Sequence, residues 1–276
     1  MSAKKEFLMT SEDFNYIRDT VYDTCGIVLG EHKKEMVYSR IARRIRALHL
    51  TNCASYIGYL IEHSEEEFSN FINAITTNLT SFFRENHHFA FLTDTIIAEL
   101  KEIHQKDRRI RIWSAGCSTG EEPYSIAMTI AEHFKRPAWD LKILASDLDS
   151  NVLASAQKGV YRSETVTGLN PDCTERWFSH DGNNEKCKVN ANLQTYIQFK
   201  RLNLLAKWPM KGPFDVIFCR NVVIYFDQAT KDTLFKRYAQ MLRKGGYLIL
   251  GHSESMNLKQ QTQFKSLGKT IYQNIG

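Results

Sequence analysis

The sequence lacks any apolar run that approaches the roughly 20 residues needed to cross a bilayer. No hydrophobic segment follows the charged N-terminal residues, so we expect no signal peptide. The six cysteines are scattered and form no C-x-x-C pair, which argues against a zinc site and against a disulfide framework. There is also no internal repeat and no low-complexity tract. We therefore expect a cytoplasmic protein that uses no metal.

The composition is otherwise that of an ordinary globular chain. Of the 276 residues, 43% are hydrophobic and 24% are charged. This length accommodates one large domain, or a medium domain with a smaller companion. The formal net charge of +5 indicates an acidic partner only where the basic residues are clustered.

The first 75 residues favour helices over strands. Thr10 offers N-cap chemistry ahead of an apolar face that contains Phe14, Ile17 and Val21. Further helices are expected at about 34–48, from near residue 54 and from about residue 65. We therefore predict an all-helical domain at 1–75 and a linker at 76–90.

From about residue 110, strands and helices alternate, which predicts a mostly parallel sheet covered by helices in a second domain at 91–276. The alternation stops at 159–195, where we expect an insertion with a small antiparallel sheet. A later helix, at about 228–242, is expected to end at Gly245 and Gly246.

Residues 109–134 read as a strand, a loop of small residues and an amphipathic helix. The next strand ends just before Asp147 and Asp149. An acid at the end of the second strand of such a unit can bind the two hydroxyls of a ribose. This segment therefore predicts a nucleoside-binding site.

The same loop favours S-adenosylmethionine over a dinucleotide. It offers only Gly116 and Gly120, whereas a dinucleotide site needs G-x-G-x-x-G. Glu121 and Glu122 also stand where a pyrophosphate would approach the helix N-terminus, which is the wrong charge for an anion. A sulfonium ligand without phosphates tolerates Glu122. The alternative is a plain crossover in which these acids favour the helix N-terminus.

Two other polar segments carry candidate ligand-binding residues. Asn78, Thr80 and Arg84 lie between the two predicted domains, where ligand sites tend to form, although an N-cap role for Thr80 or Ser81 competes. A buried strand at 214–219 is followed by polar side chains at the carboxyl edge of the sheet, where ligands bind. These are Arg220, Asn221 and Tyr225, with Asn203 after the neighbouring strand. Tyr225 is alternatively a core aromatic residue. His252 follows another strand, and we give it no catalytic role.

The predicted helix at 34–48 carries a cluster of arginines: Arg40, Arg43, Arg44 and Arg46. No acid follows Glu35 on this helix to pair with them. An unpaired cluster of this density favours docking on an acidic surface over a merely solvated face. Because no aromatic platform accompanies the arginines, we expect no nucleic-acid partner.

Taken together, the motifs resemble those of the chemoreceptor glutamate methyltransferases, the CheR family, over essentially the whole length. The matching motifs are TTNLTSFFRE (76–85), STGEEPYSIA (118–127), ASDLD (145–149), GVYR (159–162), GPFDVIFCRNVVIYFD (212–227) and GHSES (251–255). The resemblance implies an α/β fold with a Rossmann-like S-adenosylmethionine methyltransferase sheet, a small N-terminal all-helical domain and a small antiparallel β-subdomain at about 159–195.

The resemblance also implies an activity: methyl transfer from S-adenosylmethionine to receptor glutamates, giving methyl esters and S-adenosylhomocysteine for sensory adaptation in chemotaxis. The implied cofactor-binding residues are Asn78, Thr80, Arg84, Glu122, Asp147, Asn203, Leu204, Arg220 and Asn221. Arg84 and Tyr225 correspond to residues beside the transferred methyl. The basic helix would dock on the cytoplasmic helical methylation region of membrane receptors, without insertion into the membrane.

One stretch departs from part of the family. Members that bind a C-terminal receptor pentapeptide carry a glycine-containing loop in the β-subdomain, and the equivalent stretch at 179–186 is slightly shorter with one glycine. We therefore expect no dependence on such a peptide. Two rival functions are methylation of a small molecule or nucleic acid on the same fold, and non-catalytic binding of S-adenosylmethionine. The Asn/Asp-Pro-Pro-aromatic signature of amino methylation is absent.

Overall fold

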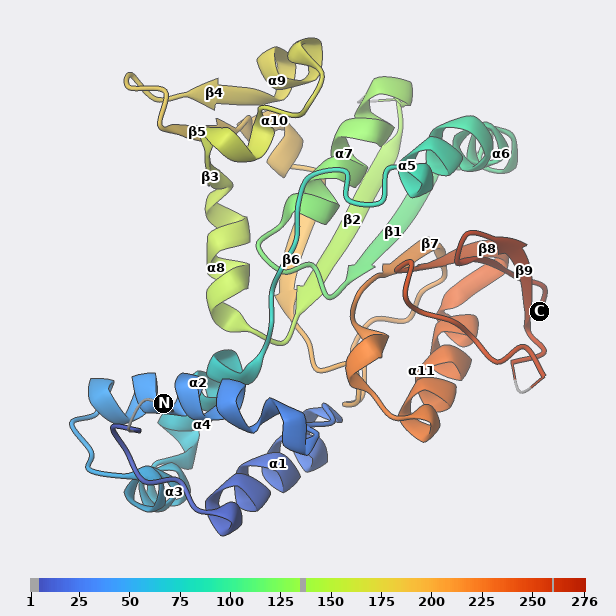
Figure 1. Cartoon of the computed structure of the whole chain (residues 1–276). Coiled ribbons are helices and arrows are strands. Elements are labelled where there is room, and N and C mark those ends of the chain that lie inside the picture. Colours follow the sequence, from blue (N-terminus) through green and yellow to red (C-terminus); the bar gives the residue numbers. More distant parts are fainter. Residues whose placement is uncertain (1–4, 135–137, 260) are drawn as a thin grey trace.

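The computed structural model describes residues 5–134, 138–259 and 261–276. Three parts can be followed in Figure 1: a helical domain at the N-terminus, a large sheet with helices, and a small separate sheet. The predicted α/β fold with a helical N-terminal domain and a small antiparallel sheet is confirmed. Within the described residues, no helix is both long and apolar enough to span a membrane.

The N-terminal helices pack around a core of their own. Thr10 begins the first helix as predicted, because its hydroxyl accepts a hydrogen bond from the Asp13 amide and the Asp13 carboxylate accepts one from the Thr10 amide. Phe14, Ile41 and Phe71, from three different helices, are fully buried in this core. The helical elements are α1 (Ser11–Cys25), η1 (Glu31–Lys33), α2 (Lys34–Ala47), α3 (Cys53–Glu62) and α4 (Ser64–Ile75).

The central sheet has seven strands in the order β6-β2-β1-β7-β8-β10-β9. The first five are parallel, and the last two pair antiparallel. Because β2 lies on one side of β1 and β7 on the other, the strand order reverses at β1, and ligands bind at such a switch point. The strands are β1 (Arg109–Ala115), β2 (Asp140–Asp147), β6 (Ile197–Arg201), β7 (Phe214–Cys219), β8 (Leu242–Leu250), β9 (Phe264–Gly268) and β10 (Ile271–Asn274).

Helices cover both faces of this sheet because successive strand residues point to opposite sides. Ile112 of β1 is buried with residues of α6 and α7, whereas the adjacent Trp113 is buried with residues of α11. The helical segment from His87 to Ile103, which contains one π-helical turn, was not predicted from the sequence. The helices are α5 (His87–Phe91), η2 (Leu92–Ile96), α6 (Ile97–Ile103), α7 (Glu121–His133), α8 (Ser150–Lys158), η4 (Val223–Tyr225) and α11 (Gln228–Met241).

The insertion forms a three-stranded antiparallel sheet in the order β3-β5-β4, as predicted. It appears at the top of Figure 1, with the helical domain at the bottom. Phe82 of the linker packs edge-on against Tyr161 and Phe178 of the insertion, so the linker contacts this part too. Its elements are β3 (Val160–Arg162), η3 (Ser163–Val166), α9 (Pro171–Trp177), β4 (Phe178–His180), β5 (Lys186–Val189) and α10 (Ala191–Gln194).

The predicted glycine stop at Gly245 and Gly246 is wrong. Helix α11 already ends at Met241, and Leu242 adopts an extended conformation that begins β8. Both glycines lie within that strand. A Cβ on Gly246 would lie 2.9 Å from the Asp215 carbonyl oxygen of β7, so glycine is needed here for close approach of two strands.

The premise that the arginines of α2 lack acidic partners is also wrong for two of the four, Arg44 and Arg46. Arg44 binds both oxygens of Glu67 on α4, at 2.8 and 2.6 Å, and the Tyr56 hydroxyl donates to the same carboxylate. Arg46 pairs with Glu6 at the surface. These acids come from other segments, so a search of α2 alone could not reveal them.

We predict that Glu67→Ala lowers the free energy of unfolding by about 3 kcal/mol, because Glu67 is 3% exposed and its loss leaves a partly buried guanidinium unpaired. Urea unfolding followed by circular dichroism would measure this change. The matched control is Glu6→Ala, which breaks a pair whose side chains are more than half exposed and should cost less than about 1 kcal/mol. Equal losses for the two variants would contradict the prediction.

Candidate functional site

The helical domain and the linker lie next to the carboxyl ends of the central strands (Figure 1). Residues from all three parts line a cavity. The N-terminal domain supplies one wall, which includes Ile27, Leu29 and Lys33. Every residue that the family resemblance assigns to the cofactor or to the transferred methyl group lines this cavity. They are Asn78, Thr80, Arg84, Glu122, Asp147, Asn203, Leu204, Arg220, Asn221 and Tyr225.

The loop after β1 forms the floor of the cavity. The Gly116 and Cys117 amides donate to the Ser146 carbonyl oxygen at 2.8 and 2.9 Å, which turns the chain back over β2. Gly116 has φ +94°, and a Cβ at this position would lie 2.3 Å from a methyl carbon of Val222. Glycine is therefore required both by the backbone conformation and by the contact with the loop after β7.

Asp147 ends β2 with its carboxylate held by the backbone and partly exposed in the cavity. Its oxygens accept from the Ser118 amide at 2.8 Å and the Asp149 amide at 3.0 Å. Burial raises the pKa of Asp147, although these amides favour the ionised form. Each carboxylate oxygen can accept a further hydrogen bond, so Asp147 can bind two neighbouring hydroxyls.

Arg220 follows β7 and is buried between two carboxylates. Its guanidinium lies 3.1 Å from Glu122 Oε2 and 3.3 Å from Glu85 Oε2, and it also donates to the Arg84 carbonyl oxygen. Burial raises the pKa of Glu122, with the Arg220 charge opposing the shift. The Ser114 hydroxyl donates to the other oxygen of Glu122 at 2.7 Å. Glu122 is therefore fixed by its neighbours at the wall of the cavity.

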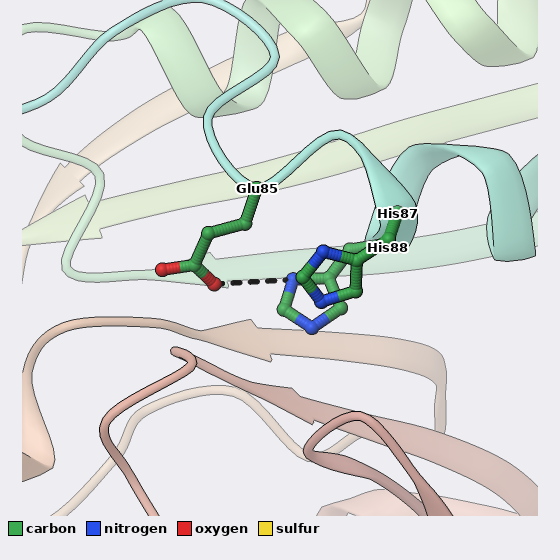
Figure 2. Close-up of side chains that lie close together, drawn as sticks. All are labelled: Glu85, His87 and His88. Carbon is green, nitrogen blue, oxygen red and sulfur yellow. Dashed lines mark ion pairs between the residues drawn. The ribbon is translucent and has the colours of Figure 1, made fainter.

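Glu85, His87 and His88 gather where the linker enters α5 (Figure 2), with three potential metal-ligand atoms within 4.8 Å of one another. However, the Glu85 oxygens already bind Arg220 and, at 2.7 Å, the His252 imidazole. Burial would raise the pKa of Glu85, but His252 and Arg220 outweigh it and hold that pKa at about 2. Burial, followed by the charge of Arg220, lowers the pKa of His88 to about 4. We interpret Glu85 as part of an ion-pair network with Arg220 and His252.

Arg84 and Tyr225 both line the cavity. One guanidinium nitrogen of Arg84 donates to the Leu79 carbonyl oxygen at 2.8 Å, which folds the side chain back along the linker. Tyr225 ends η4, and the Lys33 ammonium lies 5.4 Å from its ring centroid. Tyr225 is partly buried, packs against the core that contains Phe226 and also lines the cavity, so the structure leaves the core-aromatic alternative open.

Asn78 and Asn203 line the cavity but direct their side-chain amides into the protein. Asn78 donates to Asp149 at 2.8 Å, and Asn203 donates to the Thr24 carbonyl oxygen of α1 at 2.7 Å. Thr80 also lines the cavity. An N-cap role for Thr80 or Ser81 is wrong, because the next helix begins at His87.

Two structurally important acids, Glu85 and Glu254, were missed in the sequence. Glu254 is 3% exposed and accepts hydrogen bonds from the amides of Gly251, Asn221, Val222 and Ile224. It thereby fixes the loop after β7, where Asn221 has φ +59°. Both acids lie inside quoted motifs, TTNLTSFFRE and GHSES, but nothing in those motifs reveals their partners.

The four arginines of α2 are absent from the described residues that line the cavity. The Arg43 side chain is exposed and has no ion pair or hydrogen bond within the described part of the chain. Arg40 is partly buried and donates to the end of α4 and to the linker. Of the four arginines, Arg43 and Arg46 are exposed, whereas Arg40 and Arg44 are partly buried.

Comparison with known proteins gives family matches over nearly the whole chain. Residues 12–76 match the model "CheR methyltransferase, all-alpha domain", and residues 78–273 match "CheR methyltransferase, SAM binding domain". The chain is 41% identical to the chemotaxis protein methyltransferase of Escherichia coli (strain K12), covering 99% of this chain and 94% of that protein. It is 42% identical to chemotaxis protein methyltransferase 2 of Pseudomonas aeruginosa, covering 98% and 95%.

We predict that Glu85→Gln removes a pH-dependent part of the stability. The pKa of Glu85 is about 2 when folded against an ordinary value of 4.5, so its contribution is full above about pH 5 and declines as the pH falls toward 2. Between pH 6 and pH 3, wild type should lose about 2 kcal/mol more unfolding free energy than Glu85→Gln.

Urea titrations at the two pH values would measure the difference. The exposed Glu102 of α6 provides the control, since Glu102→Gln should follow wild type within about 0.5 kcal/mol at both pH values. Parallel losses in wild type and Glu85→Gln would show that the Glu85 charge is not held by this network.

Proposed function

This chain belongs to the CheR family of chemotaxis methyltransferases, and we propose that it transfers methyl groups from S-adenosylmethionine to glutamate side chains of chemoreceptors. The products would be a glutamyl methyl ester and S-adenosylhomocysteine. The observation that carries the proposal is that all the predicted cofactor and catalytic residues line one cavity at the switch point of the sheet. The acceptor would be the cytoplasmic helical methylation region of these receptors.

The side chains that line the cavity suit a nucleoside without phosphates. Asp147 offers carboxylate oxygens to a ribose, and Leu204 contributes apolar surface to the same cavity. Glu122 at the start of α7 would repel a pyrophosphate but is compatible with a cation. S-adenosylmethionine, as the substrate, would supply a methyl group on a positively charged sulfur. We propose that Asp147 binds the ribose hydroxyls and that the Glu122–Arg220 pair shapes the pocket.

The proposed reaction needs no general base. The glutamate side chain has an ordinary pKa near 4.3, so the attacking carboxylate is already ionised at pH 7. The enzyme must align two oppositely charged reactants and exclude water from between them. We propose that Arg84 orients a carboxylate at the cavity entrance and that the Tyr225 hydroxyl donates a hydrogen bond to the attacking group. His252 is paired with Glu85 and has no role in this scheme.

Receptor docking would use the exposed face of α2. Arg43 is free to bind an acidic receptor surface, and Arg46 becomes free if it exchanges Glu6 for a receptor carboxylate. Arg44 is held by the nearly buried Glu67, so we propose that it contributes to the fold of the domain rather than to docking.

The decisive experiment is transfer of labelled methyl groups from S-adenosylmethionine to receptor-containing membranes, followed by treatment with base. Release of the label as volatile methanol would identify a carboxyl ester and support the proposal. Base-stable label would indicate methylation at nitrogen or carbon and contradict the glutamate assignment. Cofactor binding without any incorporation would favour a non-catalytic binding protein.

We predict that Arg84→Ala lowers the methylation rate on the order of 100-fold, because the carboxylate it orients would no longer be aligned. Arg109→Ala is the matched control, since Arg109 is exposed at the amino end of β1, remote from the cavity, and should leave the rate unchanged. Equal thermal transitions would show that both variants fold. A rate for Arg84→Ala within threefold of wild type would refute its role.

We further propose that the enzyme does not depend on a receptor pentapeptide. The relevant stretch is the short turn between β4 and β5. Here the Asp181 amide donates to the Lys186 carbonyl oxygen at 3.0 Å, and the Lys186 amide donates to the Asp181 carboxylate at 3.2 Å. Calorimetric titration with a C-terminal receptor pentapeptide is expected to show no saturable heat. Binding with a low-micromolar dissociation constant would overturn this prediction.

A further inference from the structure

We propose that Arg40 is a positioning residue that holds the linker in the shape required by the cofactor cavity, and is not a receptor-docking residue. The inference rests on the proposed binding of S-adenosylmethionine at this cavity. It concerns the linker residues 76–80, which connect α4 to the wall of the cavity.

The first support is the set of groups that Arg40 binds. From α2, one guanidinium nitrogen donates to the Thr76 carbonyl oxygen at 2.6 Å and to the carbonyl oxygens of Ala74 and Ile75. The other nitrogen donates to the Thr77 hydroxyl at 2.9 Å. The last carbonyls of a helix lack partners within the helix, and a cation is favourable there. The Arg40 side chain therefore caps the C-terminus of α4 and also holds the first two linker residues, Thr76 and Thr77.

The second support is that the sheet domain holds the same linker from the other side. The Thr76 hydroxyl and the Asn78 amide both donate to one oxygen of Asp149 at 2.8 Å. Asp149 is 2% exposed, begins α8 with its other oxygen, and lies two residues beyond Asp147. The Ser118 hydroxyl donates to the Asn78 carbonyl oxygen at 2.9 Å. The linker is thus bound between Arg40 on one side and the loops after β1 and β2 on the other.

The position of the linker also affects Arg84, the proposed catalytic residue. Asn78, Leu79 and Thr80 line the cavity, and Arg84 is oriented by its hydrogen bond to the Leu79 carbonyl oxygen. Without Arg40, the end of α4 and the Thr77 hydroxyl lose their shared donor. The linker would then be held from the sheet side alone, and the cavity would lose part of its preorganised shape. Cofactor affinity should fall even when no receptor is present.

Arg43 provides a matched comparison. It lies about one turn further along the same helix and carries the same charge. Its side chain is exposed and has no hydrogen bond or ion pair within the described residues. A docking residue affects receptor binding and leaves cofactor binding unchanged. A positioning residue changes cofactor binding by itself. The two roles therefore give opposite results in an assay without receptor.

The experiment measures the dissociation constant of S-adenosylmethionine by calorimetry, without receptor, for the full chain and for Arg40→Ala, Arg40→Lys and Arg43→Ala. Amide hydrogen exchange of residues 76–82 is measured on the same proteins. We expect Arg40→Ala to weaken binding on the order of tenfold and to speed exchange in the linker. Arg40→Lys should recover part of both, because an ammonium can reach the carbonyls but cannot also bind Thr77. Arg43→Ala should match wild type in both measurements.

Wild-type affinity and wild-type linker exchange in Arg40→Ala would overturn the inference and return Arg40 to the docking surface. If Arg40→Ala does not fold, Arg40→Lys carries the test, and wild-type values for it would overturn the inference in the same way. A wild-type protein that binds no S-adenosylmethionine would instead refute the proposed function. That outcome is recognisable because no variant would then bind S-adenosylmethionine, regardless of the rate of amide hydrogen exchange in its linker.

Discussion

The arrangement of the cavity depends on one buried charge, the guanidinium of Arg220. It reaches Glu122 on α7, Glu85 at the end of the linker and the carbonyl oxygen of Arg84. A buried cation is tolerated only where partners offset its loss of hydration, so the strand end, the helix start and the linker must meet in one geometry. Since Arg84 itself supplies one of these partners, the backbone of a proposed catalytic residue is fixed by the same charge that shapes the pocket.

A second set of constraints links the loops at the carboxyl edge of the sheet. Glu254, from the loop after β8, accepts from three amides of the loop after β7 and thereby sets the position of Val222. Val222 in turn packs so closely on Gly116 that no side chain fits there. The shape of the cofactor loop after β1 is therefore determined partly by an acid far away in the sequence.

The sequence predicted what depends on local pattern and on strand direction. Asp147, Arg220 and Asn221 could be placed in one site because parallel strands end at a common edge. Prediction from the sequence failed where the role of a residue depends on a partner far away in the chain. Glu67 neutralises Arg44 from another helix, and Glu254 binds its loop through backbone amides that leave no trace in the sequence. The segment 87–103 was missed although its buried apolar residues recur at helical spacing, at Phe89, Leu92, Ile96 and Leu100.

The helical domain is more than an attachment for a partner, because it forms part of the cavity itself. Asn203 is held by the Thr24 carbonyl of α1, and Lys33 lies over the ring of Tyr225. Helix α2 presents Arg43 outward while Arg40, on the same helix, binds the linker. A partner that shifts α2 must therefore move the linker and, through Leu79, the side chain of Arg84. In this architecture, α2 is connected to the Arg84 side chain through Arg40 and a short stretch of linker.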